Sequence, residues 1–131
     1  MKLATRAVLI LIVCLAGFSL ANAKSPGQPV VIVAGVYENF TVGKGSGDLE
    51  GMRVVIVPAG DGYYAIVQIA EGGAEDPKPN FVQAEVKGKN VSFTVGEIKF
   101  TGTVSATALT VKQSGGESQV LKRKSCTTYF K

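Results

Sequence analysis

The sequence has no histidine at any of its 131 positions, and this absence excludes much of the common chemistry of enzymes. Histidine is the usual general base, it is part of Ser–His–Asp and Cys–His catalytic sets, and it is the commonest metal ligand in proteins. Only two cysteines are present, so a structural zinc site would also lack ligands. We therefore expect a protein that is not an enzyme and that carries no metal and no cofactor.

Long apolar runs are also absent, except for one near the N-terminus. The uninterrupted apolar segment 7–18 follows two basic residues and precedes a group of small residues that ends at Ala23. This run is shorter than the roughly 20 residues that a transmembrane helix needs, and the three regions together are typical of a cleavable signal peptide. We predict a signal peptide at residues 1–23, cleavage between Ala23 and Lys24, and one secreted or periplasmic domain at residues 24–131 without a membrane span.

Cysteine and net charge are both scarce in the predicted mature domain. Cys14 lies inside the signal peptide, where the preceding Val13 does not suit lipid attachment, so Cys126 has no intramolecular partner. In an oxidising compartment Cys126 can form a disulfide only with another chain, which makes an assembly module one alternative function. The formal net charge of +4 falls to +2 once Lys2 and Arg6 leave with the signal peptide. So small a charge predicts no nucleic-acid partner.

The mature region shows no long helical pattern but many short runs of β-branched and aromatic residues. Gly, Pro, Asn and Asp separate these runs, as expected for strands joined by turns. Within 81–87 apolar and polar residues alternate, which indicates one buried and one solvated face. We expect Gly35 to bend the first strand and Pro58 to end the second. The eight predicted strands are residues 30–42, 50–57, 63–70, 81–87, 91–95, 98–104, 109–111 and 118–124.

Eight short strands with mostly short connections favour pairing between sequence neighbours. An all-β, antiparallel up-and-down barrel satisfies this pattern, and its closure leaves no exposed sheet edge. A β-sandwich is the alternative, although it would need longer connections that cross between two sheets. A barrel of eight strands is just wide enough for side chains to fill it or for one small ligand. Because the inward residues are mostly Val, Ile, Phe and Leu, we expect a filled interior.

Two local patterns suggest a site but lack the spacing that the chemistry requires. The segment 43–47 is rich in glycine like a phosphate-binding loop, yet Gly45 follows its lysine where Ser or Thr is needed, and no helix follows. A hairpin loop is the better interpretation. Glu71, Glu75 and Asp76 share one loop and offer oxygen ligands for calcium, but the spacing of a calcium-binding loop is missing.

Three tyrosines and one glutamine are the candidate ligand-binding residues. Tyr63 and Tyr64 are adjacent in a predicted strand, so they must point to opposite faces, with Gln68 on the same face as Tyr64. Tyr37 belongs to the first predicted strand. Buried phenols and amides need hydrogen-bond partners, and an apolar pocket with a few such groups is typical of small-molecule sites. A structural role is the alternative for each of the four.

The order of several short motifs resembles that of small exported bacterial proteins of unassigned function. The motifs span nearly the whole mature domain: Gly35-x-Tyr37, Gly47-Asp48-Leu49-Glu50-Gly51-Met52, Asp61-Gly62-Tyr63-Tyr64 with Gln68, Ala70, Glu71 and Gly72, Val91-x-Phe93, Phe100-x-Gly102-x-Val104-Ser105 and Leu121-Lys122-Arg123-Lys124. In architecture the predicted barrel is similar to calycin-like barrels such as lipocalins and avidins. Those families use tryptophans at the barrel start or in the ligand pocket, and this chain has none, so the resemblance implies a fold and no binding residue.

Taken together, these patterns favour an exported, non-enzymatic barrel of the cell envelope that binds a small apolar ligand or a protein partner. A structural or assembly module of the periplasm or cell surface is the alternative. A carboxylate-dependent hydrolase is less favoured, because nothing in the sequence brings together two carboxylates such as Glu50 and Glu85.

Overall fold

The computed structural model describes residues 31–60, 62–73 and 75–125, and these form a single sheet of strands without a helix. The predicted signal peptide and Cys126 lie outside the described residues. The strands are β1 (Gly35–Glu38), β2 (Thr41–Val42), β3 (Leu49–Ala59), β4 (Gly62–Glu71), β5 (Asn80–Lys87), β6 (Asn90–Val95), β7 (Ile98–Val104), β8 (Ala108–Gln113) and β9 (Ser118–Lys124).

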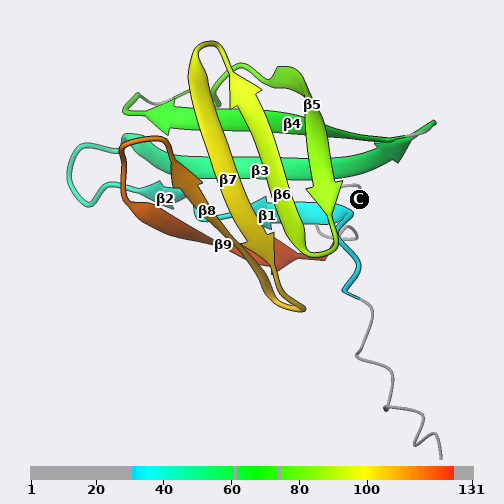
Figure 1. Ribbon diagram of the computed structural model, residues 1–131. Helices are drawn as coiled ribbons and strands as arrows, with labels where there is room; N and C mark the ends of the chain where they lie inside the picture. The colour runs from blue at the N-terminus through cyan, green and yellow to red at the C-terminus, as the bar shows by residue number, and fades with distance from the viewer. Residues whose placement is uncertain (1–30, 61, 74, 126–131) are drawn as a thin grey trace, which may run out of the picture.

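The sheet closes on itself with every pair of neighbours antiparallel. Strands β3 to β9 are neighbours in chain order, and β1 completes the ring because it pairs with both β9 and β3. Glu38 of β1 thus lies opposite Arg53 on one side and Lys122 on the other. Figure 1 shows β5, β6 and β7 crossing in front of β3 and β4. The predicted up-and-down barrel is confirmed, with β2 as one extra strand, and the strands of the described residues belong to one sheet and not to the two sheets of a sandwich.

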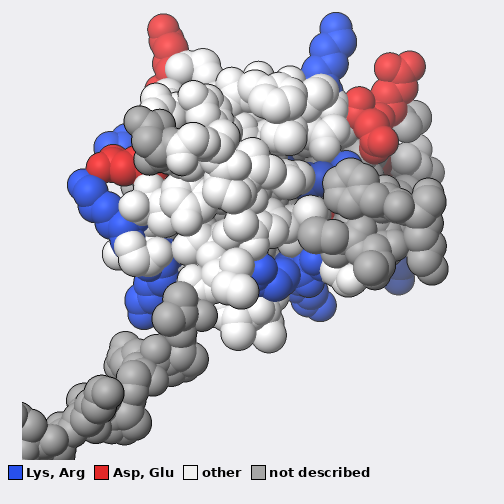
Figure 2. All heavy atoms as spheres, turned by 90° about the vertical axis from the view of Figure 1, so that its right-hand side faces the viewer, with Lys and Arg blue, Asp and Glu red and all other residues white. Residues whose placement is uncertain are grey.

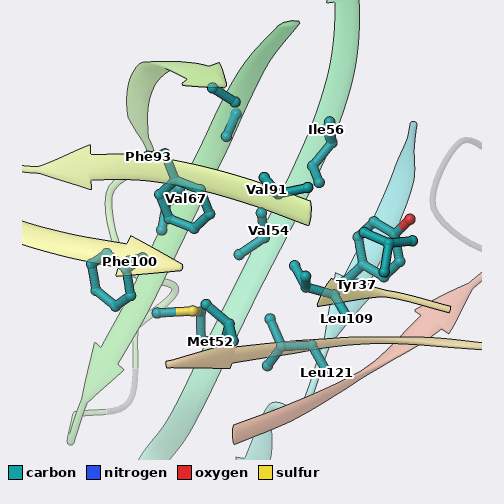
Figure 3. Close-up of a cluster of buried hydrophobic side chains, with 14 of the residues drawn as sticks. Tyr37, Met52, Val54, Ile56, Val67, Val91, Phe93, Phe100, Leu109 and Leu121 are labelled. Carbon is teal, nitrogen blue, oxygen red and sulfur yellow. The ribbon is translucent and has the colours of Figure 1, made fainter. Parts of the chain in front are cut away.

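Alternate side chains of the strands fill the barrel interior. Phe93 and Phe100 occupy paired positions on β6 and β7, and their rings stack with centroids 5.3 Å apart. Figure 3 shows these rings on one side of the core cluster and Tyr37 on the other, with Leu109 and Leu121 next to Tyr37. Each such apolar side chain contributes about 1.5–3 kcal/mol on burial. The cluster is Val33, Tyr37, Met52, Val54, Ile56, Ala65, Val67, Ala84, Val91, Phe93, Phe100, Val104, Leu109, Val111 and Leu121.

The first predicted strand, residues 30–42, is shorter in the structure and is divided in two. β1 begins only at Gly35, and Asn39 and Phe40 separate it from β2, although the register against β3 is the same on both sides of the break. Asn39 N donates to Met52 O at 3.0 Å, and Met52 N donates to the side-chain Oδ1 of Asn39 at 2.7 Å. The side-chain oxygen of Asn39 accepts the hydrogen bond from Met52 N that a main-chain carbonyl would accept in a regular ladder, and the strand is interrupted at this point.

The prediction that Pro58 ends the second strand is wrong, because β3 continues to Ala59. Pro58 lies opposite Tyr63 of β4. On the other side of β3, β1 begins opposite Ile56, so the last residues of β3 have β4 as their only paired neighbour. A proline is tolerated at such an edge because it interrupts no ladder on the open side.

Candidate functional site

Tyr37 lies inside the barrel and is completely buried. Its hydroxyl donates to Val33 O at 2.7 Å and accepts from Arg123 Nη2 at 2.6 Å. The Arg123 guanidinium also stands over the Tyr37 ring, 4.8 Å from the ring centroid. A buried phenol requires hydrogen-bond partners, and here the chain itself supplies both. The structure thus gives Tyr37 a structural role at the place where the ring of strands closes.

Arg123 of β9 ties the segment before β1 to the last strand. Its Nη1 donates to Ala34 O at 3.1 Å, and its Nη2 also donates to Ile32 O. Gly35 leaves space for this guanidinium, since a Cβ at that position would lie 2.7 Å from Arg123 Nη1. One side chain therefore bonds two carbonyls and the Tyr37 hydroxyl, and it fastens the start of the barrel to its end.

Burial raises the pKa of Tyr37 above its usual value near 10, and the Arg123 guanidinium opposes this rise. Because the pKa of Tyr37 is higher in the folded chain than in the unfolded chain, the protonated phenol contributes to the stability of the fold. This contribution is fully present below pH about 10, the pKa of an unfolded tyrosine. That contribution is lost as the pH rises from there to the higher pKa of the folded chain. We expect the free energy of unfolding, measured by urea denaturation, to fall as the pH is raised above about 10. The Tyr37→Phe variant should lack this part of the fall, and an identical pH profile would contradict the assignment.

Tyr63 points toward the interior, while its neighbour Tyr64 points to solvent. Tyr63 is half-buried and packs against the core cluster, where it borders an open hollow of about 780 Å³ with Val82 and Phe93. Tyr64 is 44% exposed. The prediction that the adjacent tyrosines face opposite sides of their strand is confirmed.

Gln68 lies on the outer face of β4, as Tyr64 does. Its Oε1 accepts from Arg53 Nη1 at 3.0 Å, and its Nε2 donates to Pro77 O at 2.8 Å. The amide therefore anchors the loop between β4 and β5 to the barrel wall. Of the four predicted ligand-binding residues, two face the interior and two face outward, so the structure does not gather them into one pocket.

An apolar strip crosses the outer face of the barrel around Tyr64. Ile66 of β4 lies opposite Val55 of β3 on one side and Phe81 of β5 on the other. Tyr64 of β4 lies opposite Val57 of β3. Phe81 of β5 is 72% exposed. Isolated exposed apolar residues are common, but contiguous ones on adjacent strands mark interaction surfaces. The outer apolar strip, as we name it, consists of Val55, Val57, Tyr64, Ile66 and Phe81.

A polar rim borders the strip where β3 meets β1. Arg53 Nε lies 2.8 Å from Glu38 Oε2, and Lys124 Nζ lies 3.5 Å from Glu38 Oε1. The Arg53 guanidinium stands over the ring of Phe40, 4.9 Å from its centroid. The side chains of Arg53 and Glu38 are only 22% and 12% exposed, so the pair is better shielded from solvent than ordinary surface ion pairs. The rim is therefore held in a fixed arrangement beside the strip.

Phe81 is a residue that the sequence prediction did not include. The signal is nevertheless present in the segment 81–87, where Phe81 occupies the same face as Gln83 and Glu85, the polar side of the alternation. A large aromatic residue on the solvent side of a regular strand departs from the pattern that folding requires. Such a departure indicates a role outside the core.

The three glutamates that could pair as catalytic carboxylates lie on the surface of the barrel. Glu50 has Glu71 as its cross-strand neighbour and not Glu85, and all three are exposed. Glu85 instead lies 2.7 Å from Lys87 Nζ, and its hydrogen bond to Lys87 is the main reason that the pKa of the Glu85 carboxyl is lowered. Carboxylic acids that serve as proton donors in catalysis are usually desolvated, and these are not. In the described residues no group of three or more His, Cys, Asp and Glu is arranged to hold a metal ion.

Charges of both signs are interspersed on the surface. On the face shown in Figure 2, uncharged residues cover most of the surface, and basic and acidic side chains are scattered around and between them. This face lacks the continuous basic field that is typical of nucleic-acid-binding surfaces. Within the ranges that the structure describes, no helix is long and apolar enough to cross a membrane.

Comparison with known proteins identifies no relative of this chain. No protein-family model matches the sequence, and neither the curated proteins nor the solved structures contain a significant match.

Proposed function

We propose that the protein is an exported, non-enzymatic binding module of the cell envelope that holds a protein partner through the outer apolar strip. The observation that carries the proposal is the exposure of Phe81 beside Ile66 and Tyr64 on adjacent strands. Exposed aromatic residues with apolar neighbours and a polar rim are the usual anchors of protein interfaces. The N-terminal pattern of residues 1–23 supports export to the periplasm or beyond.

The filled interior favours a protein partner over a small apolar ligand. The core cluster occupies the inside of the barrel, and an eight-stranded barrel has room either for its side chains or for a ligand. The open hollow beside Tyr63 is lined by polar residues such as Gln83 and Lys99 as well as apolar ones. The most continuous apolar surface lies on the outside and extends over three adjacent strands. Small molecules bind in concave sites, whereas a broad surface of this kind suits another protein.

Cross-linking at the strip in cells that export the protein is the direct test. A photoreactive phenylalanine derivative replaces Phe81 in one variant and Val120 in another; Val120 is the control because it is also apolar, 56% exposed and located on β9. We expect a discrete protein adduct from position 81 and none from position 120. Equal adducts from both positions, or no adduct from position 81, would refute the proposal.

Truncation of Phe81 should weaken binding without affecting the fold. An interface anchor contributes about 2 kcal/mol or more, so Phe81→Ala should reduce the affinity about 30-fold, measured as adduct yield from a photoreactive residue at position 64. Because Phe81 is exposed, the free energy of unfolding should change by about 0.5 kcal/mol or less. The matched variant Val120→Ala should change neither quantity.

A further inference from the structure

A groove crosses the outer face of the barrel over β6, β7 and β8, on strands that lie beyond the outer apolar strip. It has a volume of about 460 Å³. Val91, Gly102 and Val111 form its floor and lie side by side in register. The side chains of Val91 and Val111 are buried in the core, so the floor that faces solvent is main chain.

Gly102 explains why the convex wall of the barrel is hollowed at this point. It occupies an inward-facing position of β7, between the buried residues Phe100 and Val104. A Cβ at residue 102 would lie 2.7 Å from Thr110 O and 2.9 Å from Leu109 Cδ1. Because no side chain holds β7 away from these atoms, its backbone lies close to the interior, and the outer surface above it is depressed.

Two rows of polar side chains form the walls of the groove and run across the strands in register. One row ends at Glu85 and the other at Lys87, and within both rows hydroxyl and amide groups predominate. Neighbouring strands are about 4.8 Å apart, so a hydrogen-bonding group recurs at about that interval along each wall. The rows are Glu85, Ser92, Thr101, Lys112 and Ser118, and Lys87, Asn90, Thr103 and Thr110.

Charge is distributed unequally along the groove. On β5 the carboxylate of Glu85 and the ammonium of Lys87 are paired at 2.7 Å, so they present little net charge. On β8 Lys112 has no ion pair with any described residue, and its cross-strand neighbours are Thr101 and Ser118. The groove therefore offers a series of hydroxyl and amide groups with a positive charge on β8.

We propose that this groove binds a glycan chain that carries carboxylate or phosphate groups. Hydroxyls of successive sugars find donors and acceptors along both walls, and Lys112 attracts the anionic substituent as a point charge. The main-chain floor leaves room for the chain between the rows. This second site is independent of the proposed protein partner, because it uses none of the residues of the outer apolar strip, although both sites include residues of β5.

The groove does not suit an extended peptide. Peptides bind sheets mainly by adding a strand to an open edge, where they gain main-chain hydrogen bonds. Here β6, β7 and β8 each have a paired strand on both sides, so the floor offers no open edge. The mixed charge of the walls, with Glu85 among them, also does not suit a nucleic acid.

Titration of the mature chain with defined probes tests the proposal. The probes are an oligogalacturonate, a neutral maltooligosaccharide of equal length, inorganic phosphate and an oligoglutamate peptide, each followed by shifts of the amide signals in an NMR spectrum. We expect the oligogalacturonate to shift the signals of β6, β7 and β8 and to bind at least about fivefold more tightly than each of the other probes. Lys112→Gln should weaken this binding about fivefold, whereas Lys44→Gln, which removes the same charge from the turn before β3, should not.

Each contrary result would overturn the proposal and would indicate a different ligand or the absence of a site. If phosphate produces the same shifts with the same affinity, the site takes a free anion and no glycan. If oligoglutamate binds more tightly, the ligand is an acidic peptide. If no probe shifts the groove signals at millimolar concentration, or if Lys44→Gln weakens binding as much as Lys112→Gln, the groove is not a glycan site. Phe81→Ala should leave glycan binding unchanged, so the outcome of this test does not depend on whether the outer apolar strip binds a protein.

Discussion

Replacing Tyr37 by alanine should lower the free energy of unfolding by about 3–5 kcal/mol, as expected for truncation of a large buried ring. Tyr37 is completely buried and contacts the core at the closure of the barrel. Its loss would also leave the Arg123 guanidinium without the ring over which it stands and without one of its three hydrogen-bond acceptors. Domains of this size are stable by only about 5–15 kcal/mol, so the variant should be close to unfolding at room temperature.

Two smaller changes separate the hydroxyl from the ring. Tyr37→Phe keeps the ring but removes the partner of Val33 O and Arg123, which should cost about 1–3 kcal/mol. A double-mutant cycle with Arg123→Met should give a coupling energy of about 0.5–3 kcal/mol, because the two side chains are in direct contact. Urea denaturation measures all four proteins. Tyr64→Ala is the control, since this exposed tyrosine should change stability far less.

Additive effects of Tyr37→Phe and Arg123→Met on the free energy of unfolding would contradict this account. If Tyr37→Phe and Arg123→Met have independent effects, the closure of the ring does not depend on their contact. If Tyr37→Ala and Tyr64→Ala cost the same, the burial of Tyr37 is not what stabilises the barrel.

Most of the fold was predictable from the sequence because its information is local. The alternation within segments such as 81–87 defines the buried face, and the turns after Lys87 and Val95 fix the order of neighbouring strands. Local sequence patterns did not predict the features of a strand that depend on its contacts with another strand. The break at Asn39 exists because its side chain bonds Met52, and β3 runs past Pro58 because β1 does not extend that far.

The candidate site was less predictable than the fold, and for a physical reason. A tyrosine in a strand gives the same local signal whether its hydroxyl meets a ligand or a distant arginine, and Arg123 is 86 positions from Tyr37. The groove was hidden for a similar reason. Its walls join residues from five strands, and only the register places Thr101 beside Lys112 and Ser92. By contrast, the irregular alternation at Phe81 is local and was available in the sequence.

Replacing Gly51 by alanine should lower the free energy of unfolding by about 2–4 kcal/mol, the sum of an unfavourable backbone conformation and a close contact. Gly51 has φ of 110°, a region that residues with a side chain rarely adopt. A Cβ there would lie 2.7 Å from Asn39 Oδ1 and 2.8 Å from Asn39 O. The same asparagine Oδ1 accepts the hydrogen bond from Met52 N that joins the first strand to β3, so the new methyl group would strain the ladder at its break.

Gly45 provides the matched control for this prediction. Its φ of 106° is almost the same, but nothing lies within 4 Å of the position that a Cβ would occupy. Gly45→Ala therefore carries the backbone cost alone, and the difference between the two variants in urea denaturation measures the contact with Asn39. Asn39→Ala removes Oδ1 but leaves the carbonyl in place, so in this background Gly51→Ala should cost less than in the parent chain but still more than Gly45→Ala. Equal losses for Gly45→Ala and Gly51→Ala would show that the close approach of Asn39 has no role in holding β1 and β2 to β3.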